Sequence, residues 1–173
     1  GVVYRAMEEM NKAVSDFTEA LASDPGDVKA LVSRGEAFAR IRQLNKSDAD
    51  YKKALQIDET NFDALLGLAV NQVAKKEYLK AIEAFNKLDV IYPQNEVVYR
   101  NRCEAYAVKG DNMQAFNDMM ELITFNEDYS ADLPVLVDYA TKCSNYALPK
   151  ISSKVALMED EELWLQARAA LYE

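Results

Sequence analysis

The chain has 173 residues, of which 50% are apolar or aromatic and 28% are charged, and its net charge is −9 at pH 7. This balance is enough for a hydrophobic core and excludes a disordered chain, while only five Gly and four Pro among many helix formers favour an all-helical protein. The acidic charge argues against nucleic acid as a partner, because phosphate binding requires a basic face.

Four segments of similar sequence follow one another at a constant spacing, which defines a repeat unit. They read FTEALASDP at 17–25, YKKALQIDE at 51–59, FNKLDVIYP at 85–93 and MMELITFNE at 119–127. Three columns of residues recur at spacings that place them on one face of a helix. A small column holds Ala13, Ser47, Ala81 and Ala115; a large column holds Phe17, Tyr51, Phe85 and Met119; and a third holds Ala20, Ala54, Leu88 and Leu122.

Each unit contains two such helical segments, separated near residues 41–45, 75–78 and 109–112. Gly110 suits a left-handed turn residue after a helix. Asp27, Asn61 and Asn95 stand where the next helix must start, and each can accept a hydrogen bond from an unpaired amide there, so we predict that they are N-caps. A helical hairpin of this size cannot bury its own apolar face and must stack on a neighbour.

The 34-residue unit resembles the tetratricopeptide repeat (TPR), most clearly in LVSRGEAFAR and SDADYKKALQID, through Leu31, Gly35, Phe38, Tyr51 and Ala54. The resemblance implies an all-α, right-handed TPR-like superhelix, an α-solenoid of stacked antiparallel helical hairpins. The predicted units are a partial first repeat at 1–27, three repeats at 28–61, 62–95 and 96–129, a degenerate hairpin at 130–159, and a C-terminal helix at 160–173 that caps the stack or starts a further repeat. Because Gly1 aligns inside a first helix, we expect a fragment or a processed chain.

The sequence offers few groups for catalysis or for binding a metal. Histidine is absent, which removes the commonest acid–base residue. Cys103 and Cys143 form no CxxC pair, and Cys103 falls in a column of small residues where packing explains it. No glycine-rich phosphate loop is present. We therefore predict a chain that is not an enzyme and that holds no metal and no cofactor.

No apolar run approaches the roughly 20 residues that cross a bilayer, so we expect no membrane insertion and a soluble chain. The N-terminus shows no signal-peptide pattern. An upstream targeting signal stays an open alternative because the chain starts inside a repeat. A disulfide between the two cysteines is also left open, and with it the compartment.

In a TPR superhelix the first helix of each hairpin lines the concave side. The resemblance therefore implies a groove in this chain with an apolar strip flanked by mixed charges, although some of its valines have the alternative of burial between repeats. The predicted groove residues are Lys29, Val32, Glu36, Arg40, Asp63, Leu66, Val70, Val73, Val97, Arg100, Asn101, Glu104 and Val108. Some TPR proteins hold acidic chaperone tails with a carboxylate clamp of Lys, Asn and Arg, and the matching positions here are Val32, Glu36, Gly67, Val97 and Asn101. Only Asn101 and its neighbour Arg100 suit such a clamp, which disfavours a strongly acidic partner.

We predict from these observations a non-catalytic scaffold that binds a peptide or a helical segment of a partner protein in its concave groove. The alternative is a structural element that self-associates through its ends, because an uncapped end of a repeat stack exposes an apolar face. A third hypothesis places residues 159–173 in the groove as an internal ligand.

Overall fold

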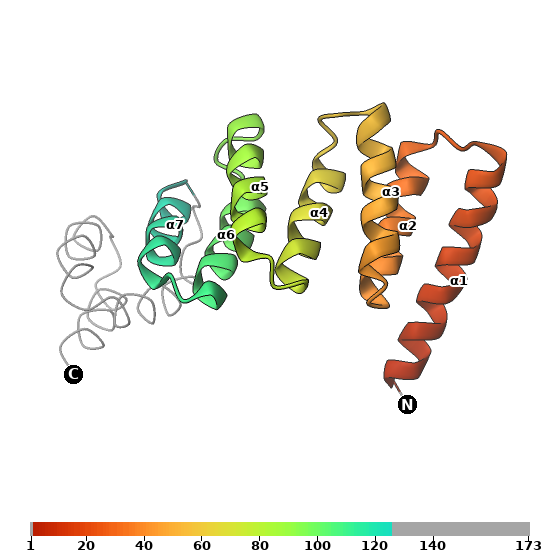
Figure 1. Ribbon diagram of the computed structural model, residues 1–173, viewed down its shortest axis with the longest axis horizontal. Coiled ribbons are helices and arrows are strands. Elements are labelled where there is room, and N and C mark those ends of the chain that lie inside the picture. The colour runs from red at the N-terminus through yellow and green to blue at the C-terminus, as the bar shows by residue number, and fades with distance from the viewer. Residues whose placement is uncertain (1, 126–173) are drawn as a thin grey trace. The chain divides into compact units, whose positions relative to one another are not determined.

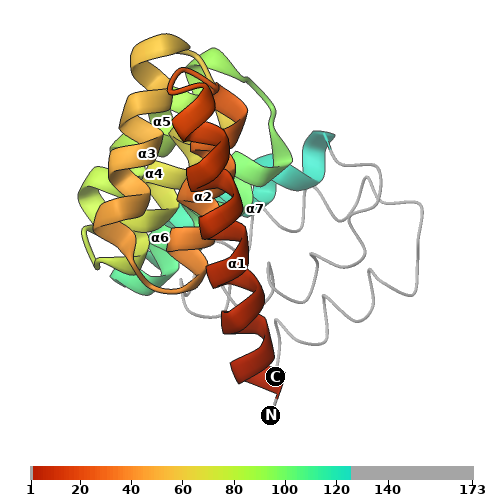
Figure 2. The same cartoon turned by 90° about the vertical axis from the view of Figure 1, so that its right-hand side faces the viewer.

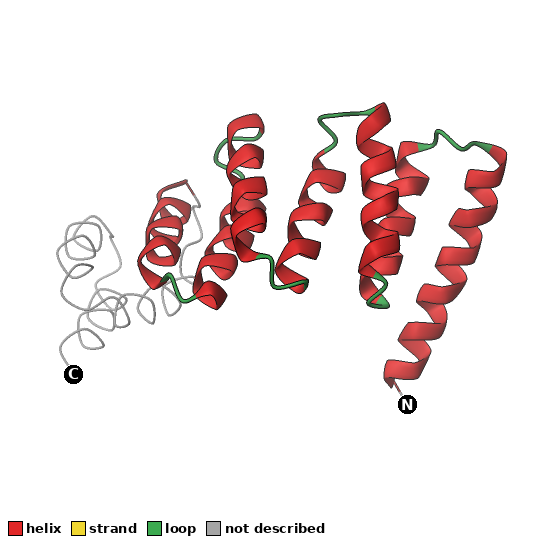
Figure 3. Cartoon of the chain, in the orientation of Figure 1, coloured by secondary structure: helices red, strands yellow, loops and turns green. Residues whose placement is uncertain are grey.

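The computed structural model describes residues 2–125, and every regular element in that range is an α-helix (Figures 1 and 3). The predicted all-α class is confirmed. The units predicted at 130–159 and 160–173 lie outside the described residues. The helices are α1 (Val2–Ser23), α2 (Val28–Arg40), α3 (Leu44–Ile57), α4 (Phe62–Ala74), α5 (Tyr78–Ile91), α6 (Glu96–Lys109) and α7 (Asn112–Phe125).

The chain divides into two compact units, residues 1–91 and 92–173. In the first unit α2 packs on α3 and α4 packs on α5, so that each pair is a hairpin, and α1 packs on α2 while α3 packs on α4. In the second unit α6 and α7 form a hairpin of the same kind. Each helix of a hairpin therefore has a partner for its apolar stripe, as the helical spacing of its apolar residues requires.

The predicted caps are confirmed at the start of three helices. Asp27 accepts a hydrogen bond from the amide of Ala30 at 3.0 Å, and Asn61 accepts one from the amide of Ala64 at 3.1 Å. Asn95 accepts from two amides of α6, at 3.0 and 3.3 Å. Each cap satisfies donors that the helix itself cannot pair, which explains why Asp or Asn recurs at this position.

The hairpin turns repeat as well. Arg42, Lys76 and Gly110 have positive φ angles of 63°, 63° and 92°, and they occupy the same position in successive repeat units. Gly110 thus has the left-handed conformation predicted for it. A left-handed Arg or Lys is strained, because its Cβ crowds the backbone, so the packing of the two helices in each hairpin must offset that strain.

The three apolar columns are buried in the complete hairpins. Tyr51, Phe85 and Met119 of the large column are 2%, 0% and 4% exposed, and the small and third columns are 0–1% exposed in the same hairpins. In the first unit this stripe joins the core between α1, α2, α3 and α4, which includes Leu21, Leu31, Tyr51 and Ala64. The columns read from the sequence are therefore the hydrophobic core.

The N-terminal helix differs from the hairpin pattern. The repeat pattern predicts that residues 1–27 hold the end of a first helix followed by a second, but α1 is one continuous helix of 22 residues. Its first turns extend beyond α2 and α3 (Figure 2). Glu8, at the position of Arg42 and Lys76, is helical and pairs with Lys12 at 3.0 Å. The turn that the repeat pattern places near this position is thus absent, and α1 runs through it as a helix.

Candidate functional site: the face formed by α2 and α4

Helices α2 and α4 are the first helices of two successive hairpins, and they contact each other. The ring of Tyr51 on α3 separates these two helices, because it lies between Gly35 of α2 and Gly67 of α4. A Cβ atom added at Gly35 would lie 2.7 Å from Tyr51 Cε1, and one added at Gly67 would lie 2.5 Å from Tyr51 Cε2. Both positions therefore need glycine while Tyr51 is present, and the three residues together set the spacing of α2 and α4.

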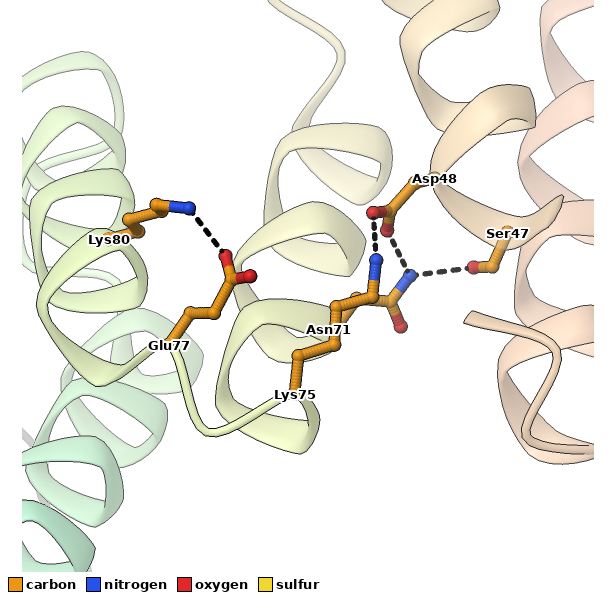
Figure 4. Close-up of polar contacts among 6 residues, drawn as sticks. All are labelled: Ser47, Asp48, Asn71, Lys75, Glu77 and Lys80. Atoms are coloured by element: carbon orange, nitrogen blue, oxygen red, sulfur yellow. Dashed lines mark hydrogen bonds and ion pairs between the residues drawn. The ribbon is translucent and has the colours of Figure 1, made fainter. Parts of the chain in front are cut away.

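A polar cluster fixes α4 against α3 (Figure 4). The Asn71 amide is 2% exposed and donates to Ser47 Oγ at 2.8 Å and to Asp48 Oδ1 at 2.7 Å. The Lys75 ammonium pairs with the other oxygen of Asp48 at 2.5 Å. Because a buried amide is costly without partners, these bonds hold one register between the two helices. The cluster thus fixes α4 on α3, the helix whose Tyr51 ring sets the spacing of α2 and α4.

The first unit brings seven of the predicted groove residues to the surface of α2 and α4. We call this surface the α2–α4 face. Val70 is 39% exposed, Leu66 and Val73 are half-buried, and these three form an apolar strip along α4. The charged residues Lys29, Glu36, Arg40 and Asp63 are exposed and form no ion pair with any other residue between 2 and 125. The face therefore combines an apolar strip with charges whose pairing capacity is unused.

Val32 does not belong to this face. It is 7% exposed and packs in the core with Leu21, Leu31 and Tyr51, so it supports the surface from beneath and is not available to a ligand. This is the alternative of burial between repeats that the sequence left open for the valines.

The pKa of the Tyr51 phenol is raised by its burial and by the charges around it. Burial raises the pKa of its phenol to about 12, a hydrogen bond with Ser47 opposes the rise, and the negative charges of Glu36, Asp48 and Asp63 add to it. Glu36 and Asp63 thus act on the phenol from α2 and α4, where each is itself exposed. At neutral pH the phenol is protonated, and it has no proton-transfer role there.

The remaining predicted groove residues lie on α6 in the second unit. Val97 and Val108 are 44% and 54% exposed, and Glu104 is exposed. Arg100 and Asn101 are half-buried and bond within their own helix: Arg100 Nε pairs with Glu96 at 2.8 Å, and Asn101 Nδ2 donates to the Val97 carbonyl at 2.7 Å. The α6 residues therefore form a second surface, with apolar and charged side chains, within the second unit.

The side chains of residues 2–125 form no metal-binding cluster. No three His, Cys, Asp or Glu side chains in that range converge as a metal would require. The Cys103 side chain is 2% exposed and its thiol donates to the Ala115 carbonyl at 3.3 Å, so it packs inside its hairpin, as its place in a column of small residues predicted. No helix of the described range is long and apolar enough to span a bilayer.

The sequence interpretation missed a recurring ion pair inside the hairpins. Arg34 of α2 forms two bonds with Asp50 of α3, at 2.8 and 2.7 Å, and Arg102 of α6 forms two with Asp118 of α7, at 2.8 and 2.9 Å. The hydrogen bond and the charge of Asp50 raise the pKa of Arg34 against the effect of its burial. The sequence carried a signal for these pairs, because Arg and Asp have the same separation in both and recur at the same positions of their repeat units.

The stacked helical hairpins of the described range define a helical-repeat fold. Residues 28–61, which hold α2 and α3, match the tetratricopeptide repeat family. Tetratricopeptide repeat protein 6 of Homo sapiens is 27% identical over 119 residues, which are 67% of this chain and 23% of that protein. The chain spans between 9% and 23% of the length of the curated relatives it matches.

Solved structures agree on the fold. TTC0263, a thermophilic TPR protein of Thermus thermophilus, superposes with a TM-score of 0.65 at 17% identity, over 100% of this chain and 96% of that one. YrrB, described as a TPR protein with an unusual peptide-binding site, gives 0.63 at 15% identity, over 94% and 84%. The described residues thus have the all-α, TPR-like solenoid fold that the sequence predicted.

Proposed function

We propose that this chain binds a peptide or a helical segment of a partner protein on its α2–α4 face. The observation that carries the proposal is the partly exposed strip of Leu66, Val70 and Val73 beside four exposed charges without ion pairs in the described range. Apolar anchors give affinity when they are buried, and the charged rim selects the partner. The peptide-binding site named for YrrB is consistent with this use of the fold.

The charges of the face describe the partner. Lys29 and Arg40 are positive, whereas Glu36 and Asp63 are negative, so the four charges cancel over the face. A uniformly acidic or basic ligand would meet repulsion from one half of them. The fitting ligand is an apolar segment with charges of both signs at its edges. In the second unit, the α6 residues Val97, Arg100, Asn101, Glu104 and Val108 are a separate candidate binding surface.

The buried contacts beneath the α2–α4 face favour binding without a rearrangement of the helices. Tyr51 and the Asn71 cluster fix α2 and α4 through buried contacts, so little reorganisation is needed on binding. A preformed surface loses less conformational entropy than a flexible one, and its affinity then depends on contact quality.

The test is a peptide-display selection on the chain, repeated with the double variant Leu66→Asp and Val70→Asp. The matched control is Leu79→Asp with Val90→Asp on α5, since these leucine and valine side chains are 72% and 83% exposed outside the face. Far-UV circular dichroism must show that both double variants stay helical. Ligands that bind the native chain and the control, but not the face variant, are expected. Ligands that bind all three proteins equally would refute the proposal.

Self-association through the ends of the array is the alternative function, and it is tested separately by sedimentation over a concentration series. A chain that sediments as a monomer throughout would exclude it. Residues 159–173, suggested from the sequence as an internal ligand, lie outside the described residues, and deletion of that segment should increase peptide binding if it occupies the face.

A further inference from the structure

A solvent-open cleft of about 420 Å³ lies where the turn between α2 and α3 meets the C-terminal end of α4. Its walls are formed by residues 42–46, which are the end of the turn and the first residues of α3, and by Lys75 at the end of α4. The lining includes three cations, Arg42, Lys46 and Lys75, and no acid. The cleft therefore concentrates positive charge in a chain whose net charge is −9.

Two of these cations have no anionic partner in the part of the chain that the structure describes. Arg42 and Lys46 are exposed and form no ion pair there. The Lys46 ammonium lies 5.4 Å from the centre of the Phe38 ring, a contact that does not neutralise its charge. Lys75 differs, because it pairs with Asp48 at 2.5 Å, which fixes its ammonium against α3 (Figure 4). The charges of Arg42 and Lys46 are thus available to a bound anion.

The next two hairpins fill the corresponding place with a carboxylate of their own. The counterparts of Gln43 in the following repeat units are Glu77 and Asp111. Glu77 pairs with Lys80 at 2.9 Å, and Asp111 pairs with the lysine that ends α6 at 3.4 Å. Lys46 is the counterpart of Lys80, but the residue at position 43 is a neutral amide, so Lys46 lacks the carboxylate that Lys80 has. An anion from outside the chain would supply the missing charge.

We propose that this cleft binds a phosphate monoester, carried either by a small molecule or by a phosphorylated side chain. Near neutral pH such a group bears close to two negative charges, which match the two unpaired cations, whereas a carboxylate would offset only one. The guanidinium fork of Arg42 can bond two phosphate oxygens at once, and the side-chain amides of Gln43 and Asn45 are neutral donors in the same wall. The cleft shares no residue with the α2–α4 face and is independent of the function proposed for that face.

The test is a titration of the whole ¹⁵N-labelled chain with methyl phosphate, followed by the NMR shifts of the backbone amides at constant ionic strength. The shifts should concentrate at residues 42–46 and 75, and acetate should bind about tenfold more weakly because it carries one charge fewer. A short alanine peptide with one phosphoserine distinguishes the two sources of the phosphate. Tighter binding of this peptide than of methyl phosphate supports a phosphorylated side chain, and equal or weaker binding supports a small molecule.

Two variants of the cleft, each with a matched control, separate this site from general electrostatic attraction. Gln43→Glu gives the hairpin the carboxylate that the next two hairpins have, and Lys46→Gln removes one unpaired cation, so each should weaken methyl phosphate binding about tenfold. Gln56→Glu and Lys53→Gln make the same exchanges at exposed positions of α3 outside the cleft and should leave binding nearly unchanged.

The NMR spectrum of each variant also shows whether it is folded. Equal binding of methyl phosphate to the native, Gln43→Glu and Lys46→Gln chains would overturn the proposal, and so would no binding to the native chain. Acetate that binds as tightly as methyl phosphate, or shifts spread over the whole chain, would overturn it too, because neither result requires a phosphate site at the cleft.

Discussion

Replacing Gly67 by Ala tests whether the Tyr51 ring sets the spacing of α2 and α4. Alanine is the better helix former, by about 1 kcal/mol, so on propensity alone the substitution should stabilise the chain. Its Cβ would, however, lie 2.5 Å from Tyr51 Cε2 and 2.8 Å from the phenol oxygen, well inside contact distance. The ring is 2% exposed and has Gly35 on its other side, so it cannot move away freely.

Overpacking of this kind costs about 1–3 kcal/mol. After the gain in helix propensity, we expect Gly67→Ala to lower the free energy of unfolding by up to about 2 kcal/mol. Tyr51→Leu provides the second arm of a double-mutant cycle, because leucine lacks Cε2, Cζ and the hydroxyl, the three atoms that the new Cβ would meet. In the Tyr51→Leu background, Gly67→Ala should therefore stabilise by about 1 kcal/mol, so the effect changes sign.

The assay is urea unfolding followed by far-UV circular dichroism for the native chain, both single variants and the double variant. Equal m-values are required before free energies are compared, since repeat arrays can lose cooperativity. If Gly67→Ala changes stability by the same amount in both backgrounds, the Tyr51 ring does not explain the glycine, and the account of the α2–α4 spacing is wrong.

Three other predictions concern stability. Asp118→Ala should lower the free energy of unfolding by about 3–5 kcal/mol in urea titrations, because it leaves the buried Arg102 without its carboxylate; a loss no larger than that of an exposed ion pair would contradict this. The pKa of Tyr51 is about 12 in the folded chain against about 10 in the unfolded chain. Its contribution to the free energy of unfolding is therefore constant below pH 10 and is lost only in alkali. Above pH 10 the unfolded chain loses the proton first, so about 1–2 kcal/mol should be lost as the pH rises towards 12, and Tyr51→Phe should remove this dependence in urea titrations run across that range. Ala54→Leu or Ala81→Leu, at positions 0% exposed, should cost about 1–3 kcal/mol by forcing hairpin helices apart, and unchanged thermal unfolding would show that the register is wrong.

The elements that the sequence predicted are those whose signal is local or repeats. Asp27, Asn61 and Asn95 cap helices because an N-cap is decided by one side chain and the amides that follow it. The apolar columns are buried because their period is that of a helix face, and Gly110 is left-handed because glycine bears no Cβ penalty there. Four copies of the pattern reinforce one another, which a single helix could not do.

The features that the sequence did not predict depend on a neighbour in space. Helix α1 continues through the position where the other units turn, and the local sequence around Glu8 does not show this. The repeat pattern places Val32 among the groove positions, but Val32 lies in the core. Its exposure depends on how α2 packs on α1 and α3. The residues of the α2–α4 face have no repeat signal at all, so their use stays a proposal.

This contrast has a physical origin in the repeat itself. Positions that pack one helix on the next face the same environment in every unit, so Tyr51, Phe85 and Met119 share size and burial although they are chemically different. The position of Leu66 does not share one environment, because its counterpart Val32 lies in the core and its counterpart Arg100 pairs with Glu96 on the surface of α6. The binding proposed for the α2–α4 face therefore rests on the strip of α4, where a column that varies coincides with an accessible apolar surface.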